Sequence, residues 1–153
     1  MQPDLATLFV GFETKEFPTL ENISSLPQPP SNGGYIYAVF WAVPNCPDVP
    51  LYVGQTQELR NRMWDYCEAH FKACTDFRVG EAVKYLRGKG CRVTVRYNAC
   101  DHPRSEERRI IRELQVSGPR LINGLVAYDY ATCSEEEERR FIQRFCDLIL
   151  RQR

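Results

Sequence analysis

A segment rich in proline and glycine divides this chain into two unequal parts. It runs from Leu26 to Gly34 and reads LPQPPSNGG. Proline fixes φ and removes a hydrogen-bond donor, and glycine loses much conformational entropy on ordering, so neither a helix nor a central strand can continue through the segment. We therefore expect residues 1–33 to form an N-terminal arm and the folded domain to begin at about residue 34.

Length and composition favour one globular domain. The 153 residues are 43% apolar, enough for a single core. The 20 Lys and Arg balance 20 Asp and Glu, which excludes attraction to a polyanion through net charge, although basic residues concentrate between positions 51 and 120. The seven cysteines include no CxxC pair, and no segment is apolar enough to cross a membrane. We expect a cytoplasmic protein with reduced thiols and no membrane partner.

Hydrophobic periodicity predicts an α+β fold. Aromatic and β-branched runs at 35–41 and 51–53 predict a hairpin with a long loop, and alternation over 91–97 predicts a third strand. We expect a small three-stranded, mostly antiparallel sheet flanked by helices. The domain should cover 34–124, and 125–153 should be a helical extension packed on it, with a capping box at Ser134 and Glu137. The predicted helices span 57–74, 81–87, 105–116 and 134–150.

Four side chains that are distant in sequence are predicted to line one cleft. Arg62 and Tyr66 are four residues apart and share one face of their helix. Tyr37 and Tyr52 lie on adjacent strands of the hairpin, where paired or diagonal side chains come close. Arg62 and Tyr66 can therefore both address one ligand.

Glu107 is the most informative single residue. Together with Ile110, Ile111 and Leu114 it falls on the helix stripe that should face the core. Burying an unpaired carboxylate is costly, so a divalent cation with oxygen ligands is the natural compensation. Two alternatives stay open: Glu107 is a first-turn acid that favours the helix dipole, or Glu106 takes its place if the helix phase is shifted by one residue.

These residues, in this order and spacing, resemble the GIY-YIG nuclease domain, the type of catalytic module found in the excinuclease subunit UvrC. The resemblance covers 34–124. Arg62 lies ten residues after Tyr52, the first residue of the second tyrosine triplet, and the aromatic Tyr66 lies four residues after Arg62. Tyr35 replaces the usual first glycine, and Gln55 stands where many relatives have lysine. The matching positions are Tyr35-Ile36-Tyr37, Tyr52-Val53-Gly54, Arg62, Tyr66, Glu107 and the exit PRLIN at 119–123.

The resemblance implies a metal-dependent endonuclease that hydrolyses DNA by in-line attack of water, with RNA not excluded. One Mg²⁺ or Mn²⁺ would be held by Glu107 and several waters, and Arg62 would bind the scissile phosphate. Tyr52 would act as general base, with a pKa lowered by Arg62 and the metal, or would orient the water. Tyr37 would position its partners, and Tyr66 would bind the phosphate. The expected DNA contacts are Gln55, Arg60, Lys84, Arg87, Lys89, Arg92, Arg96 and Arg120.

Three alternatives remain at this stage. The chain can be a catalytically weak or inactive module of the same fold that binds nucleic acid, or a protein-interaction module in which the tyrosines are core. The C-terminal helix is the expected surface for a homodimer or a specificity partner. A zinc site is the third alternative, although small buried thiols are the commoner explanation. Its five candidate ligands are Cys67, His70, Cys74, Cys100 and His102.

Overall fold

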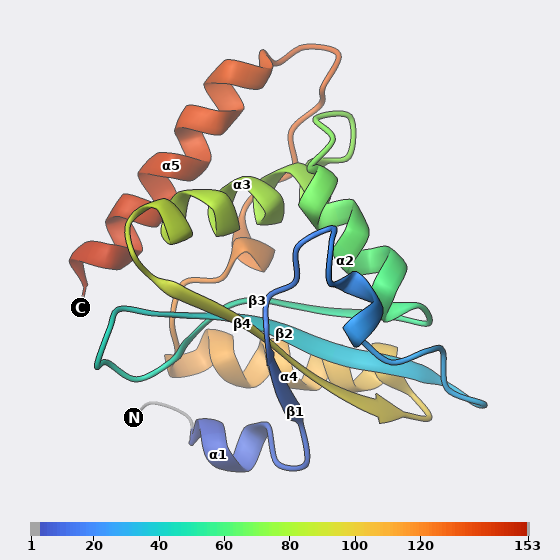
Figure 1. The fold of residues 1–153 in the computed structure, drawn as a ribbon. Helices are drawn as coiled ribbons and strands as arrows, with labels where there is room; N and C mark the ends of the chain where they lie inside the picture. The colour runs from blue at the N-terminus through green and yellow to red at the C-terminus, as the bar shows by residue number, and fades with distance from the viewer. Residues whose placement is uncertain (1–3, 153) are drawn as a thin grey trace.

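The computed structural model describes residues 4–152 and shows an α+β fold built on one antiparallel sheet (Figure 1). The four strands are β1 (Glu13–Glu16), β2 (Gly34–Ala42), β3 (Val49–Thr56) and β4 (Arg92–Cys100). Their order across the sheet is β1-β4-β2-β3, and every neighbouring pair is antiparallel. The strand β3 therefore forms one edge of the sheet.

Helices cover both faces of the sheet (Figure 1). Helices α2 (Leu59–Glu68), α3 (Cys74–Gly88) and α5 (Glu135–Arg151) lie on one side, while α1 (Leu5–Leu8) and α4 (Pro103–Ser117) lie on the other. Short 3-10 turns occur at Ile23–Ser25 and Ile122–Gly124. Every residue of β2 is buried, which explains why its sequence is an unbroken apolar run rather than an alternation.

The sheet has four strands, so the prediction of three was wrong. The additional strand β1 comes from the segment expected to be an arm, and it pairs with the edge of β4. Its sequence, ETKE, carries little strand propensity. The strand forms because Tyr97 donates a hydrogen bond to Glu13 at 2.9 Å and the Phe17 amide donates to the Val93 carbonyl at 2.9 Å.

The predicted helix over 57–74 is two elements. The helix α2 ends at Glu68, where Ala69 adopts a left-handed φ of 51°. The chain then turns, and α3 starts at Cys74, earlier than the predicted start at 81. A Cβ on Gly80 would overlap the Tyr66 carbonyl, so α3 passes very close to the end of α2 at this glycine. The regular spacing of apolar residues thus continues across the turn between the two helices. Periodicity alone therefore does not show that α2 ends there.

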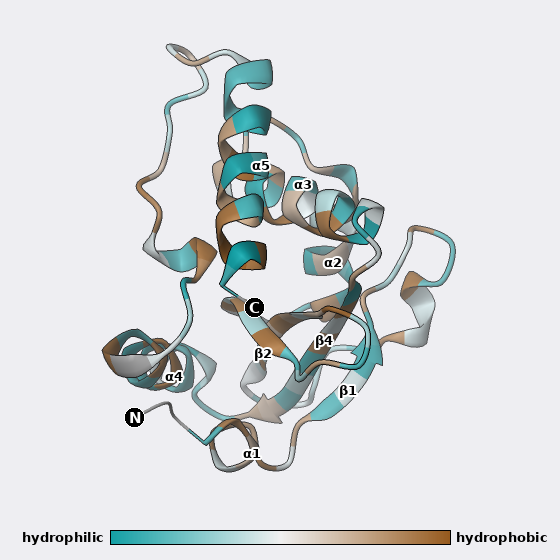
Figure 2. Cartoon of the chain, turned by 90° about the vertical axis from the view of Figure 1, so that its left-hand side faces the viewer, coloured by the Kyte–Doolittle hydropathy of each residue, from teal (hydrophilic) through white to brown (hydrophobic). Residues whose placement is uncertain are grey.

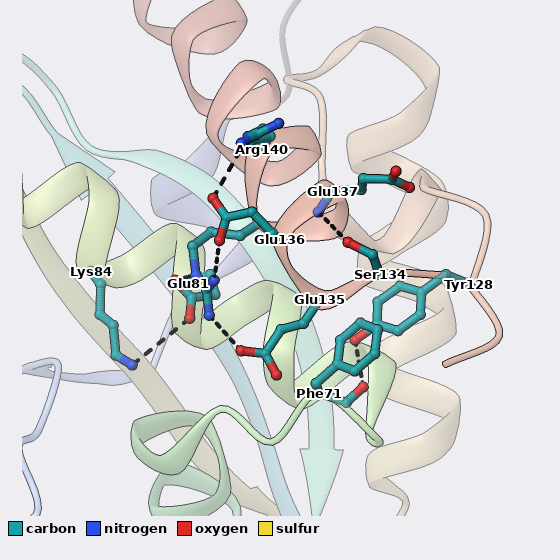
Figure 3. A network of polar contacts seen from close by, with 10 residues as sticks. Phe71, Glu81, Lys84, Tyr128, Ser134, Glu135, Glu136, Glu137 and Arg140 are labelled. Atoms are coloured by element: carbon teal, nitrogen blue, oxygen red, sulfur yellow. Dashed lines mark hydrogen bonds and ion pairs between the residues drawn. The ribbon is translucent and has the colours of Figure 1, made fainter. Parts of the chain in front are cut away.

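The helix α5 docks on α3 in the same domain. The Ser134 hydroxyl accepts a hydrogen bond from the Glu137 amide at 3.1 Å, as the capping-box motif predicts. Figure 3 shows this N-terminal turn beside α3. Arg139 links the two helices through an ion pair to Glu81 of α3 at 3.5 Å, and it also pairs with Glu135 of its own helix at 2.8 Å. The apolar side of α5 adds Ile142, Cys146 and Ile149 to the main core, while Leu148 is 39% exposed.

Within residues 4–152, none of the helices combines the length and apolar character needed to cross a bilayer.

Candidate active site

Three phenol rings meet near the β3 edge of the sheet, on the side covered by α2 and α3. Tyr37 comes from β2, Tyr52 from β3 and Tyr66 from α2. Their ring centroids lie 6.4 Å apart for Tyr37 and Tyr52, 6.3 Å for Tyr37 and Tyr66, and 6.1 Å for Tyr52 and Tyr66. The hydroxyls of Tyr37 and Tyr66 share a short hydrogen bond. The predicted convergence of these residues is therefore found in the structure.

The register of the hairpin explains how the phenols come together. Tyr37 pairs with Gly54 and Val39 pairs with Tyr52, so the two tyrosines are diagonal neighbours on one face. Gly54 has no Cβ, and an added Cβ would fall inside van der Waals contact of the Tyr37 hydroxyl and the Tyr52 ring. The glycine of the second triplet is thus required by the tyrosine opposite it.

Replacing Gly54 by alanine should destabilise the fold, because the Tyr37 ring must move in a site that is fully packed. Overpacking of this kind costs about 1–3 kcal/mol in the free energy of unfolding. Urea denaturation measures it. The matched control is Gly88→Ala, where an added Cβ has nothing within 4 Å and no loss is expected. Equal stability of the two variants would contradict the steric account of Gly54.

The environment keeps all three phenols protonated at neutral pH. Burial raises the pKa of Tyr37, Tyr52 and Tyr66, and the neighbouring phenols raise it further for Tyr37 and Tyr52. Arg62 acts in the opposite direction, but its effect on Tyr52 is the smaller one, and Glu107 adds to the rise. Arg62 alone therefore does not bring the Tyr52 pKa below its ordinary value, and the expected lowering by Arg62 and a metal together stays a prediction. The three hydroxyls are hydrogen-bond donors.

Arg62 lies directly beside this cluster. Its guanidinium stacks over the Tyr66 ring at 4.8 Å from the centroid, which confirms that the two residues share one helix face. It also forms a close ion pair with Asp76 in the first turn of α3 and a long one with Asp65 at 3.8 Å. The Arg62 side chain is still 29% exposed. Asp76 was missed by the sequence analysis, because nothing in the sequence signals that α3 begins there.

Glu107 lies at the margin of the buried face of α4. Ile110 and Leu114 are completely buried, whereas the Glu107 carboxyl is half-buried, and burial raises its pKa. Its effect on the Tyr52 pKa places the carboxylate within electrostatic reach of that phenol. No hydrogen bond or ion pair to this carboxylate is found among residues 4–152. Glu106, the alternative, instead pairs with Arg109 at 2.8 Å.

Asn123, from the motif PRLIN, closes the exposed edge of β3. Its amide nitrogen donates to the Val53 carbonyl at 2.7 Å, and its amide oxygen accepts from the Val53 amide at 2.9 Å. One side chain therefore replaces a neighbouring strand next to Tyr52. A cavity of about 160 Å³ opens here, lined by Tyr52, Arg78 and Asn123 among others.

The substitution Asn123→Ala should destabilise the protein, because it leaves two part-buried backbone groups of Val53 without partners. We expect a loss of about 1–3 kcal/mol in the free energy of unfolding. Hydrogen exchange should show faster exchange of the Val53 amide. Asn61→Ala, at an exposed asparagine of α2, is the matched control and should leave both quantities unchanged.

The eight predicted DNA contacts do not form one surface. Arg60 donates to the Leu26 carbonyl at 2.6 Å and Arg87 donates to the Phe17 carbonyl, so both hold the N-terminal segment. Among the others, only Gln55 lies on β3, the strand that carries Tyr52. Arg92 and Arg96 share Asp48, Lys84 pairs with Glu81, Lys89 lies over the Tyr85 ring, and Arg120 is exposed after α4.

The sequence analysis also overlooked three arginines on α4, at Arg104, Arg108 and Arg112. Two of them lower the Glu107 pKa, in opposition to burial. Their spacing of four residues is visible in the sequence, and it places them along one side of the helix, separate from the apolar residues.

The part of the chain that the structure describes contains no group of three or more His, Cys, Asp or Glu side chains arranged to hold a metal. Cys67, one of the proposed zinc ligands, donates instead to the Pro18 carbonyl at 3.3 Å. Comparisons with protein-family models, with curated proteins and with solved structures found no match. A functional proposal therefore rests on the geometry of the site.

Proposed function

We propose that this protein is a metal-dependent endonuclease of the GIY-YIG type that hydrolyses phosphodiester bonds in DNA. One observation carries the proposal: the Arg62 guanidinium and three neutral phenols converge near the β3 edge of the sheet, and the half-buried Glu107 carboxylate of α4 acts electrostatically on one of them, Tyr52. They come from β2, β3, α2 and α4, which are distant in sequence. Such a set can bind a phosphodiester and neutralise the charge that develops on it.

The residues present fit a single divalent cation. A partly desolvated carboxylate that has no hydrogen bond or ion pair within residues 4–152 is a suitable ligand for Mg²⁺ or Mn²⁺, which keep several waters and need few protein ligands. Glu107 would hold the ion in this scheme. When bound, the ion supplies positive charge at the scissile phosphate and the leaving oxygen.

The protein's own groups have separate tasks in this proposal. Arg62 binds a nonbridging phosphate oxygen through the exposed part of its fork, while Asp76 fixes its orientation. Tyr66 donates a hydrogen bond to the phosphate, and Tyr37 holds Tyr66 in place. With its pKa raised, Tyr52 orients the attacking water rather than removing its proton.

Nicking of supercoiled plasmid tests the proposal. The purified protein should convert supercoiled DNA to the nicked form with Mg²⁺ or Mn²⁺ and not with EDTA. Loss of this activity in both Arg62→Ala and Glu107→Ala, in parallel preparations, would exclude a contaminating nuclease. If no DNA or RNA substrate is cleaved at any metal concentration, the proposal is wrong.

One observation favours a second candidate, a nucleic-acid-binding module of the same fold without turnover. Arg62 is already paired with Asp76, and the pKa values of Tyr37, Tyr52 and Tyr66 are all raised. For such a module we expect salt-sensitive DNA binding with no cleavage.

A further inference from the structure

Three arginines form a row along α4. Arg104, Arg108 and Arg112 are spaced by four residues, and all three side chains are exposed. None has a hydrogen bond or ion pair with another residue in the range 4–152. By contrast, the guanidiniums of Arg60, Arg62, Arg78, Arg87, Arg92, Arg96, Arg109, Arg139 and Arg140 all contact protein carbonyls or carboxylates.

The row faces away from the sheet and passes close to Glu107. Ile110 and Leu114 bury the inner side of α4, so residues about half a turn away point outward. Figure 2 shows α4 at one side of the molecule, with no helix beyond it. Arg104 lies three residues before Glu107 and Arg108 directly after it in the same helix, so the two arginines flank the carboxylate on the α4 surface. The positive row and Glu107 therefore share one stretch of the α4 surface.

We infer that this arginine row is the docking surface for the phosphate backbone of duplex DNA, which it leads past Glu107. The inference rests on the proposed function and adds to it where the substrate lies. With a rise of 1.5 Å per residue, the row spans roughly 12 Å. That length corresponds to about three to four nucleotide steps of one strand, at 3.4 Å each. Each guanidinium can bind a phosphate through its fork.

The same geometry favours a polyanion over a membrane surface. A helix that lies in a bilayer interface buries its apolar side in lipid. In α4 that side is already packed on the sheet through Ile110 and Leu114. Only the charged side is presented to a partner. Phosphates at regular spacing match a row of cations at regular spacing.

Binding of a fluorescent duplex in EDTA, followed by anisotropy, tests the inference without requiring cleavage. The substitution Arg112→Gln is used first, because Arg112 lies furthest from Glu107 in the row. We expect weaker binding and a slope of log K against log salt reduced by about 0.9; the triple change at 104, 108 and 112 should reduce it by about 2.7. Arg144→Gln, at an exposed and unpaired arginine of α5, is the matched control and should bind as the wild type does.

The outcomes separate this inference from the proposed function. If the triple variant binds duplex as tightly as the wild type while the wild type nicks plasmid, the docking surface is wrong and the nuclease proposal stands. If the triple variant binds duplex more weakly than the wild type but the wild type cleaves no DNA, the docking surface stands and the nuclease proposal is wrong. The inference also fails if the wild type does not bind duplex, binds only single-stranded RNA, or binds vesicles of phosphatidylserine in preference. Thermal unfolding of each variant confirms that it is folded.

Discussion

Glu107→Gln is expected to abolish metal-dependent cleavage and leave the fold intact. Glutamine has the same shape but no charge, so the divalent ion would lose its only protein carboxylate. Charge stabilisation by a metal is worth several kcal/mol in the transition state, which corresponds to a loss of about 10³-fold or more in rate. Single-turnover nicking in Mg²⁺ measures it. The adjacent Glu106→Gln removes a carboxylate that pairs with Arg109 and should retain most of the activity.

In EDTA, Glu107→Gln is also expected to change the melting temperature, and the direction of the change follows from the Glu107 pKa. Burial raises the Glu107 pKa above its ordinary value of 4.5. The folded state therefore holds the proton more tightly than the unfolded state, and the wild type loses stability as pH rises through the folded pKa. Glutamine has no such loss. We expect a higher melting temperature for Glu107→Gln at pH 7, and no difference well below pH 4.5.

Divalent cations supply an additional readout that is independent of cleavage. Mg²⁺ or Mn²⁺ should raise the melting temperature of the wild type and not that of Glu107→Gln, since binding to the folded state alone stabilises it. A glutamine variant that is less stable than wild type at pH 7 in EDTA would mean that Glu107 has a stabilising partner, contrary to the geometry described above.

Local patterns predicted those parts of the fold in which each element is determined by its own sequence. The unbroken aromatic run predicted β2, and the Ser134 and Glu137 pair predicted the start of α5. Apolar spacing put Glu107 on the α4 stripe that faces the core, and the structure has it at the margin of that stripe. Arg62 and Tyr66 met because helix geometry alone brings residues four apart together.

Other features depend on contacts between distant segments, and the sequence carries no local sign of them. The strand β1 exists because β4 offers an edge to pair with. The break between α2 and α3 depends on the close approach at Gly80. Asp76 pairs with Arg62 only because the chain turns between α2 and α3. The Tyr52 pKa depends on how deeply the side chain is buried, which the spacing of apolar residues does not predict.

Arg62→Lys is expected to reduce cleavage by about 10²-fold, mainly in the rate at saturating DNA. Lysine keeps the positive charge but cannot bind Asp76 and a phosphate oxygen simultaneously through a planar fork. Loss of one positioned donor to a developing oxyanion costs about this factor. Because the charge is kept, Asp76 remains paired, so the melting temperature should change much less than in Arg62→Ala, which leaves that carboxylate unpaired.

Two comparisons make the Arg62 result specific to the site. Arg60 lies two residues away along the same helix, where its guanidinium holds the Leu26 carbonyl, and the Arg60→Lys variant should cleave nearly as well as the wild type. Asp76→Asn leaves Arg62 in place but removes the charge that orients it, so it should lower the rate less than Arg62→Lys does. If Arg62→Lys and Arg60→Lys lost activity equally, the loss would reflect the stability of α2, and Arg62 would have no role at the phosphate. If Asp76→Asn instead increased the rate, the ion pair would be a restraint that substrate must break, and Asp76 would compete with the phosphate for the same guanidinium rather than position it.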